Sequence, residues 1–178
     1  MSRTHANRGQ GFERVLADLH AIYERQGRAS VIRTPPAMRI LRAAGGPGQF
    51  VCVFDGEGPP DLFVMAGGVA IVADAKDCAS DRWALEHLPK HQADRFDAHE
   101  RQGGTAGVIL RMAGAVWWLP WVAVGPLWWE HAGKVGRAAR GTASLSVADC
   151  DRIGLRCRGA DWLPMALSAI TSLGGSNP

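Results

Sequence analysis

Apolar side chains recur at helical spacing close to the start of the chain. The positions that would share one helical face are Phe12, Val15, Leu16, Leu19, Ile22 and Tyr23. Gly27 follows this run, and glycine commonly ends a helix because it adopts the left-handed backbone conformation without strain. The pattern predicts an amphipathic helix over about residues 10–26, with Glu13 in its first turn.

Short apolar runs bounded by turn residues predict strands further along. Residues 30–33 and 50–54 have the length and composition of strands. Residues 106–112 are continuously apolar apart from Arg111, which is typical of a central strand buried on both faces. Glycine and proline residues around the second run indicate a short protruding loop over about residues 43–57.

Two further helices are expected in the second half of the chain. One begins near Pro89 and runs to Arg101, and its inward stripe includes Gln92 where an apolar residue would ordinarily lie. Gln92 is therefore a candidate for positioning water or a ligand. The other helix begins near Leu163, and the tail over residues 173–178 is expected to be disordered.

Residues 112–129 form a stretch of 18 residues without a charged side chain. This length barely reaches a membrane span, and Pro120 and Pro126 interrupt it, so two short buried strands around a turn are favoured instead. The five tryptophans of the stretch are expected to lie in the core or in a dimer surface. The alternative is a platform on which nucleic-acid bases stack.

The most informative segment is residues 61–76, in which two apolar runs meet at Gly67-Gly68. Two glycines supply the positive φ angles of a type I′ turn, so the segment predicts a tight β-hairpin. A two-residue turn here places Asp61 directly opposite Asp74 on one face, with Cβ atoms about 5 Å apart. Lys76 projects from the same face, because alternate residues of a strand share a face.

Two facing carboxylates destabilise a sheet unless something offsets their repulsion. A divalent cation held by Asp61 and Asp74 would do so, because hard oxygen ligands suit Mg²⁺ and leave positions open for water and phosphate. In the alternative interpretation, Lys76 pairs with one of the aspartates at a frayed strand end and no ion is bound.

The chain is 47% hydrophobic and 21% charged, which is the composition of an ordinary soluble domain. We expect one domain over residues 1–178. The four cysteines show no metal-ligand or disulfide spacing, which favours a reducing, cytoplasmic compartment. Residues 1–42 hold eight bases and three acids, residues 43–100 four bases and ten acids, and residues 101–178 eight bases and four acids. Basic flanks around an acidic middle are typical of an enzyme that binds a polyanion through its basic residues and a cation through its acidic ones. In the alternative interpretation, the charged residues lie on unrelated solvent-exposed faces, which would give the same counts.

Asp61, the hairpin, Asp74-Ala75-Lys76 and a following helix with Gln92 together resemble the PD-(D/E)xK nuclease core. One branch of these nucleases shares further features: Asn7-Arg8-Gly9 before Glu13, then Tyr23, Gly27, Ala29, Thr34-Pro35-Pro36, and His91-Gln92 followed by Gly103-Gly104. Over about residues 7–140 the chain therefore resembles the RecU-type Holliday junction resolvases of bacteria and their phages.

The resemblance implies an α/β fold with a restriction-endonuclease-like core, in which helices flank a central mixed β-sheet. It implies a homodimer that cuts four-way junction DNA symmetrically with Mg²⁺ or Mn²⁺. The implied metal ligands are Asp61, Asp74 and the Ala75 carbonyl, with Lys76 positioning or activating the attacking water, and with Glu13 and Gln92 assisting the site. The expected phosphate contacts are Arg8, Arg33, Lys90, Lys134 and Arg137.

Three features differ from the usual pattern of these resolvases. Asp74 stands where Glu is usual, Pro60 stands where Thr or Ser is common, and residues 43–57 are short beside the stalk that such resolvases insert into the junction centre. Two rival functions stay open: an endonuclease with the same core that acts on linear DNA, and a dimeric junction-binding protein that does not cut. Recombination or branch-migration proteins are candidate further partners, in a bacterial cell or a phage-infected host.

Overall fold

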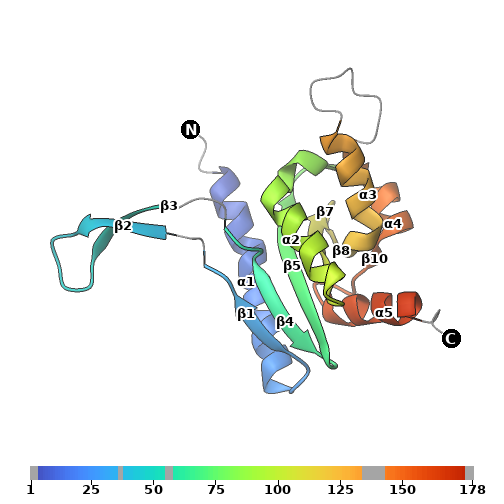
Figure 1. Ribbon diagram of the computed structural model, residues 1–178, viewed down its shortest axis with the longest axis horizontal. Coiled ribbons are helices and arrows are strands. Elements are labelled where there is room, and N and C mark those ends of the chain that lie inside the picture. Colours follow the sequence, from blue (N-terminus) through green and yellow to red (C-terminus); the bar gives the residue numbers. More distant parts are fainter. Residues whose placement is uncertain (1–3, 36–37, 55–57, 134–142, 175–178) are drawn as a thin grey trace.

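In the computed structural model, a six-stranded mixed sheet forms the centre of the chain and helices cover both of its faces (Figure 1). The structure describes residues 4–35, 38–54, 58–133 and 143–174. In spatial order the strands are β1 (Ser30–Arg33), β4 (Leu62–Ala66), β5 (Val69–Cys78), β7 (Thr105–Met112), β8 (Ala115–Pro120) and β10 (Leu155–Arg156). Strands β5 and β7 are parallel and the other neighbours are antiparallel. The predicted central mixed sheet flanked by helices is thus confirmed.

Two apolar cores lie on opposite faces of this sheet. Helices α1 (Thr4–Arg25) and α5 (Leu163–Gly174) pack on one face, and α2 (Lys90–Arg101) and α3 (Trp121–Ala132) pack on the other. The second core also receives α4 (Val147–Ile153), the short helix η1 (Leu85–His87), and the small sheet of β6 (Arg82–Ala84) and β9 (Ser144–Ser146). Alternate residues of β5 supply both cores, since Val72 lies on the α2 side and Ala73 on the α1 side.

Helix α1 begins at Thr4 rather than near residue 10, so Glu13 lies in the middle of the helix and not in its first turn. The sequence pattern could not show this, because residues 4–11 contain a single apolar side chain, Ala6, and therefore no apolar stripe. The helix ends as predicted, with Gly27 in the left-handed conformation at φ 64°.

The prediction of two strands over residues 112–129 is wrong in its second half. Strand β8 ends at Pro120, and helix α3 then starts with Pro120 as its N-cap. Trp121, Val124 and Trp128 are buried at helical spacing, and a Cβ at Gly125 would lie 2.9 Å from the Trp121 ring. Four of the five tryptophans in this stretch are buried, as expected for core residues.

The predicted protruding loop over residues 43–57 is a β-hairpin that begins earlier. Strands β2 (Met38–Ala43) and β3 (Phe50–Phe54) pair only with each other and extend away from the main sheet (Figure 1). Residues 55–57 lie outside the described chain. The disordered tail was expected from residue 173, but α5 continues to Gly174, so the expectation is wrong for residues 173–174; residues 175–178 lie outside the described chain. No helix in the described part of the chain has the length and apolar character needed to cross a membrane.

Candidate active site

The hairpin of β4 and β5 has the predicted turn and register. Gly67 and Gly68 have φ angles of 57° and 79°, as a type I′ turn requires. Ala66 pairs with Val69 and Leu62 pairs with Ala73, so Asp61 is the next residue in line with Asp74. The turn geometry predicted from two adjacent glycines thus brings these two carboxylates together.

Strand β5 continues beyond the point where β4 begins, and this difference in length creates the site. From Asp74 onward β5 pairs with β7 on one side, while on its other side Oδ2 of Asp61 accepts a hydrogen bond from the Ala75 amide at 2.9 Å. The amide and carbonyl of one strand residue point to the same side. The Ala75 carbonyl therefore also faces the side on which Asp61 lies.

Asp74 is the most buried charged side chain of the site, with 1% of its surface exposed. The side-chain amide of Gln92 on α2 donates a hydrogen bond from Nε2 to Asp74 Oδ1 at 2.6 Å. Nζ of Lys76 lies 2.6 Å from the other carboxylate oxygen and donates to Oε1 of Gln92 at 3.3 Å. The three side chains thus form a closed polar triangle on the α2 side of the sheet, and the predicted inward position of Gln92 is confirmed.

Burial raises the pKa of Asp74 to about 6; the Lys76 ammonium opposes this rise, and the Asp61 carboxylate adds to it. Oδ2 of Asp74 has no well-directed hydrogen bond, although the Lys76 ammonium lies beside it in an ion pair. A buried carboxylate oxygen in this state retains capacity for a further electrostatic partner.

The donor set around Asp61 and Asp74 fits a hard divalent cation. Two carboxylates and the Ala75 carbonyl offer oxygen atoms only, the ligand chemistry that Mg²⁺ and Mn²⁺ prefer. Within the described ranges, no group of three or more His, Cys, Asp or Glu side chains gathers at metal-binding distance. A cation here would therefore depend on two side chains, a main-chain oxygen and ligands from water or substrate.

Glu13 reaches the same region from the opposite face of the sheet. It lines a cavity of about 400 Å³ together with Asp61, Ala75 and residues at the end of β1. Its carboxylate lies 3.9 Å from the guanidinium of Arg33. The predicted helical acid is thus beside Asp61, whereas Lys76 and Gln92 do not line this cavity.

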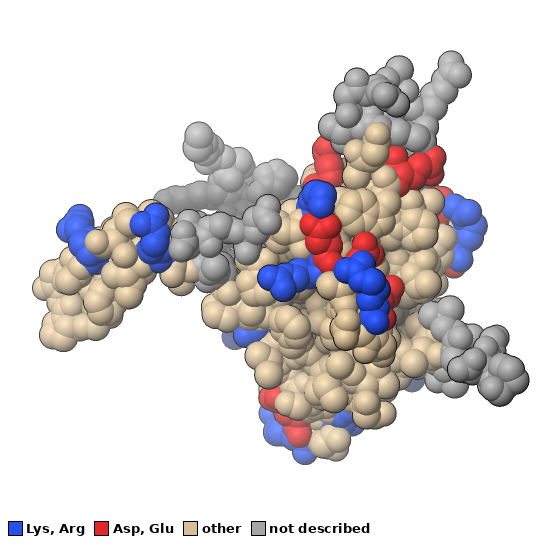
Figure 2. Space-filling model, in the orientation of Figure 1, with Lys and Arg blue, Asp and Glu red and all other residues tan. Residues whose placement is uncertain are grey.

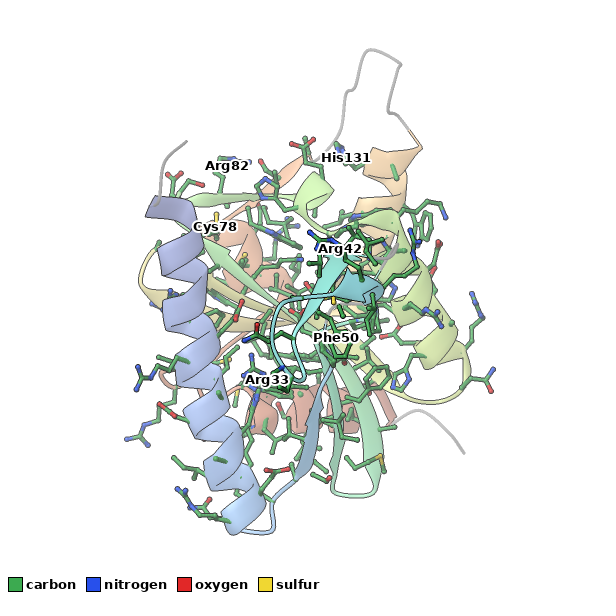
Figure 3. All side chains as sticks on the ribbon, turned by 90° about the vertical axis from the view of Figure 1, so that its left-hand side faces the viewer. Arg33, Arg42, Phe50, Cys78, Arg82 and His131 are labelled. Atoms are coloured by element: carbon green, nitrogen blue, oxygen red, sulfur yellow. The ribbon has the colours of Figure 1, made fainter. Side chains whose placement is uncertain are left out.

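The predicted phosphate contacts fall into three groups. Arg33 lies at the cavity, on the side of the molecule from which the β2–β3 hairpin projects (Figure 3). Lys90 begins α2, where its ammonium pairs with Asp94 at 2.8 Å and lies over the Trp129 ring, so it does not join Asp61 and Asp74. Arg8 lies in α1 with its side chain undescribed, and Lys134 and Arg137 fall outside the described residues.

Sequence reasoning missed one contact that positions the site. Asp77, next to Lys76, binds the Arg111 guanidinium of β7 through both oxygens, at 2.7 and 2.5 Å. The same guanidinium lies 4.6 Å from the ring centre of Phe12, the residue before Glu13. This chain of contacts fixes α1 against the end of β5. The only sequence signal was a charged residue, Arg111, inside an otherwise apolar strand.

The chain matches one protein family and is similar to a solved structure. The family described as RecU, Recombination protein U, matches residues 7–139. Curated proteins give no match. Among solved structures, the chain is similar to Hjc, a Holliday junction resolvase from the archaeal hyperthermophile Archaeoglobus fulgidus, with 14% sequence identity and a TM-score of 0.46. That similarity covers 81% of this chain and 94% of Hjc.

The family match covers the helix with Glu13, the hairpin with Asp61 and Asp74, Lys76, and the helix with Gln92. It therefore spans every element that builds the candidate active site. On this match, which extends over well more than half of the chain, the protein belongs to the Recombination protein U (RecU) family.

Proposed function

We propose that this protein is a Holliday junction resolvase, an endonuclease that cuts four-way DNA junctions by metal-dependent phosphodiester hydrolysis as a symmetric homodimer. The observation that carries this proposal is the convergence of Asp61, Asp74 and Lys76 at one end of the β4–β5 hairpin, in a chain of the RecU family. The all-oxygen donor set and the adjacent ammonium are the groups that hydrolysis of a phosphodiester needs.

The proposed roles follow from the contacts of each side chain. Asp61, Asp74 and the Ala75 carbonyl hold the cation; when bound, a divalent ion supplies positive charge against the phosphate oxygens and the leaving group. Gln92 holds Asp74 in place through its 2.6 Å hydrogen bond. The Lys76 ammonium donates a hydrogen bond to the attacking water or to a phosphate oxygen. Its positive charge stabilises the transition state.

A homodimer follows from the symmetry of the substrate. Two opposing strands of a junction must be cut, and a two-fold dimer presents one site to each. The chain has apolar surface that a second copy could cover: Ile32 pairs with Phe63 across β1 and β4, and both side chains are exposed on the same face. Single exposed apolar side chains are ordinary, but a cross-strand pair on an edge strand is typical of an interface.

Basic side chains on the β2–β3 hairpin support a nucleic-acid substrate. Arg39 and Arg42 belong to this hairpin, and its visible face carries basic but no acidic side chains (Figure 2). Such a surface attracts a phosphate backbone without reading its sequence. Recognition of a branched shape rather than of bases is therefore expected.

The decisive experiment compares cleavage of a synthetic four-way junction with cleavage of linear duplexes that have the same arm sequences, with and without Mg²⁺. We expect paired nicks in opposing strands of the junction, only with the metal. Equal cleavage of linear DNA would instead indicate a general endonuclease. Junction binding without cleavage under any divalent metal would indicate the non-cutting dimeric module.

A further inference from the structure

Directional contacts attach helix α1 to the rest of the molecule both near its C-terminal end and beside Glu13. Near the C-terminal end, the Tyr23 hydroxyl donates a hydrogen bond to Oδ1 of Asp161 at 2.6 Å. Beside Glu13, the Arg111 guanidinium of β7 lies 4.6 Å from the ring centre of Phe12. Apolar contacts along the helix stabilise its packing on the sheet, but the hydrophobic effect is not directional, so the directional contacts contribute to its exact placement.

Arg111 is a cation at the end of an apolar face of the sheet. Along β7 it shares this face with Ile109, which packs in the core beneath α1. In the parallel pairing of β5 and β7, Arg111 lies opposite Asp77, and its guanidinium binds the two Asp77 oxygens at 2.7 and 2.5 Å. Two parallel hydrogen bonds fix the plane of the guanidinium, and this fixed group contacts the ring of Phe12.

Both partners of the Arg111 guanidinium are direct neighbours of residues of the candidate active site. Asp77 follows Lys76 on β5, and Phe12 precedes Glu13 on α1. The side chains of Arg111 and Asp77 are only 32% and 17% exposed, so water screens this ion pair less than it screens a pair on an open surface. One side chain therefore connects the strand that carries Lys76 to the helix that carries Glu13.

We propose that Arg111 is a positioning residue of the nuclease site, which holds Glu13 in place beside Asp61 by bridging Asp77 and the ring of Phe12. This inference rests on the proposed function, because it gives Arg111 a part in the same reaction. Glu13 and Asp61 border one cavity but belong to different elements, so their separation depends on where α1 lies on the sheet. A misplacement of about 1 Å can cost about 100-fold in rate, so a contact outside the site can control the reaction.

Arg111→Lys tests the geometry of the contact at constant charge. An ammonium still pairs with Asp77, but it lacks the planar fork that binds two oxygens in parallel and stacks on a ring. The net charge near Asp77 is unchanged, so an effect on the rate cannot come from a lost charge. Arg156→Lys is the matched control, because the Arg156 guanidinium also lies over a ring, 5.6 Å from the centre of Trp117, but does not line the cavity of Glu13.

With a four-way junction as substrate, Arg111→Lys is expected to lower kcat at least about tenfold and to leave KM unchanged. KM stays the same because Arg111 acts on the placement of a protein side chain and not on the binding of DNA. Arg156→Lys should change neither constant. Arg111→Lys protein that cuts at the wild-type rate would overturn the positioning role, whereas wild-type protein that cuts no junction would overturn the proposed function instead.

A double-mutant cycle with Glu13 separates positioning from general destabilisation. Glu13→Gln removes the carboxylate that Arg111 places, so Arg111→Lys should cost nothing further in that background. Phe12→Leu keeps an apolar side chain but removes the ring, and it should lower kcat in the same way and add nothing to Arg111→Lys. Losses of Arg111→Lys and Glu13→Gln that multiply would show that Arg111 acts by another route. Single-turnover cleavage with excess protein measures all of these rates.

Hydrogen exchange of the metal-free protein gives a measurement that does not depend on cleavage. The amides of residues 12–16 should exchange faster in Arg111→Lys than in the wild type, because the fork no longer holds this part of α1. The amides of residues 20–25, around Tyr23, should exchange at the wild-type rate, and Arg156→Lys should alter neither segment. Equal exchange of residues 12–16 in Arg111→Lys and the wild type would contradict the positioning role, whether or not the protein cuts DNA.

Discussion

Gln92 on helix α2 donates its side-chain N–H to Oδ1 of Asp74, 18 residues earlier on strand β5, over 2.6 Å. The same amide accepts from the Lys76 ammonium through its oxygen. One neutral side chain thereby orients both a proposed metal ligand and the proposed catalytic cation. No charged residue could take both contacts, since a carboxylate only accepts hydrogen bonds and an ammonium or guanidinium only donates them, whereas an amide does both.

Gln92→Ala is expected to weaken metal use rather than to destroy the fold. Groups that orient metal ligands typically contribute 10–100-fold to metal affinity or activity. The Mg²⁺ concentration for half-maximal junction cleavage should rise by about that factor, with the rate partly recovered at high Mg²⁺. Gln102→Ala, at the exposed end of α2, should leave the Mg²⁺ dependence unchanged. An unaltered Mg²⁺ profile in Gln92→Ala would remove Gln92 from the site.

Asp74→Asn is expected to abolish cleavage and to leave junction binding nearly intact. The substitution keeps the size of the side chain but removes the negative charge that a cation requires, and the loss should exceed about 100-fold because even an orienting group can reach that value. Gel cleavage assays measure the first effect, and binding assays without metal measure the second. Cutting at the normal rate would show that Asp74 is not a ligand.

Stability should depend on pH through His20. Burial lowers its pKa in the folded protein to about 4, against 6.5 in an unfolded chain, so between these values the unfolded state binds more protons. The free energy of unfolding is therefore unaffected by this group above about pH 6.5 and falls as the pH drops towards 4. At pH 5 the loss is on the order of 2 kcal/mol.

Urea denaturation at pH 7 and pH 5 measures this difference. In His20→Gln, which has no titrating group at this position, the fall in unfolding free energy between the two pH values should be smaller by roughly the same 2 kcal/mol. Equal falls in the variant and the wild type would show that protonation of His20 is not linked to unfolding.

The parts of the site that could be predicted from the sequence depend on short-range geometry. Two glycines fix a turn, a turn fixes a register, and the register places Asp61 beside Asp74 with no knowledge of the rest of the chain. Gln92 was predictable for a similar reason, because a polar residue on the buried stripe of a helix must meet a polar partner.

The parts that could not be predicted depend on contacts between residues far apart in the sequence, or they lie in segments whose apolar residues do not mark one buried face. Strand β2 is exposed at all six positions, so no alternation of buried and exposed residues marked it. Helix α3 is apolar and rich in residues that also favour strands, and only packing against α2 and β7 decides its conformation. The bond between Trp162 and His20 joins residues 142 positions apart.

The affinity for the junction should depend less steeply on salt concentration when the positive charge of Arg33 is removed. A contact with one phosphate contributes about one unit to the slope of log affinity against log salt concentration. Arg33→Gln should therefore reduce that slope by about one, whereas Arg25→Gln, at the far end of α1, should not change it. Lys90→Gln should change it less, because the Lys90 ammonium already pairs with Asp94. Identical slopes for Arg33→Gln and Arg25→Gln would contradict a phosphate contact at Arg33.

Removing the β2–β3 hairpin should separate junction selectivity from catalysis. Met38 and Phe54 pair across the two strands, so their Cα atoms are about 5 Å apart and a short glycine linker can replace residues 39–53. The main sheet and both cores contain no residue of the hairpin, so the melting temperature should change little.

The hairpin carries Arg39, Arg42 and the exposed ring of Phe50, which suit the centre of a branched DNA better than a continuous helix. Without it, the ratio of the dissociation constants for linear duplex and four-way junction should fall at least about tenfold, a loss of about 1.4 kcal/mol of discrimination. A hairpin-free protein that still prefers junctions to the wild-type degree would show that the rest of the chain, and not the hairpin, recognises branching.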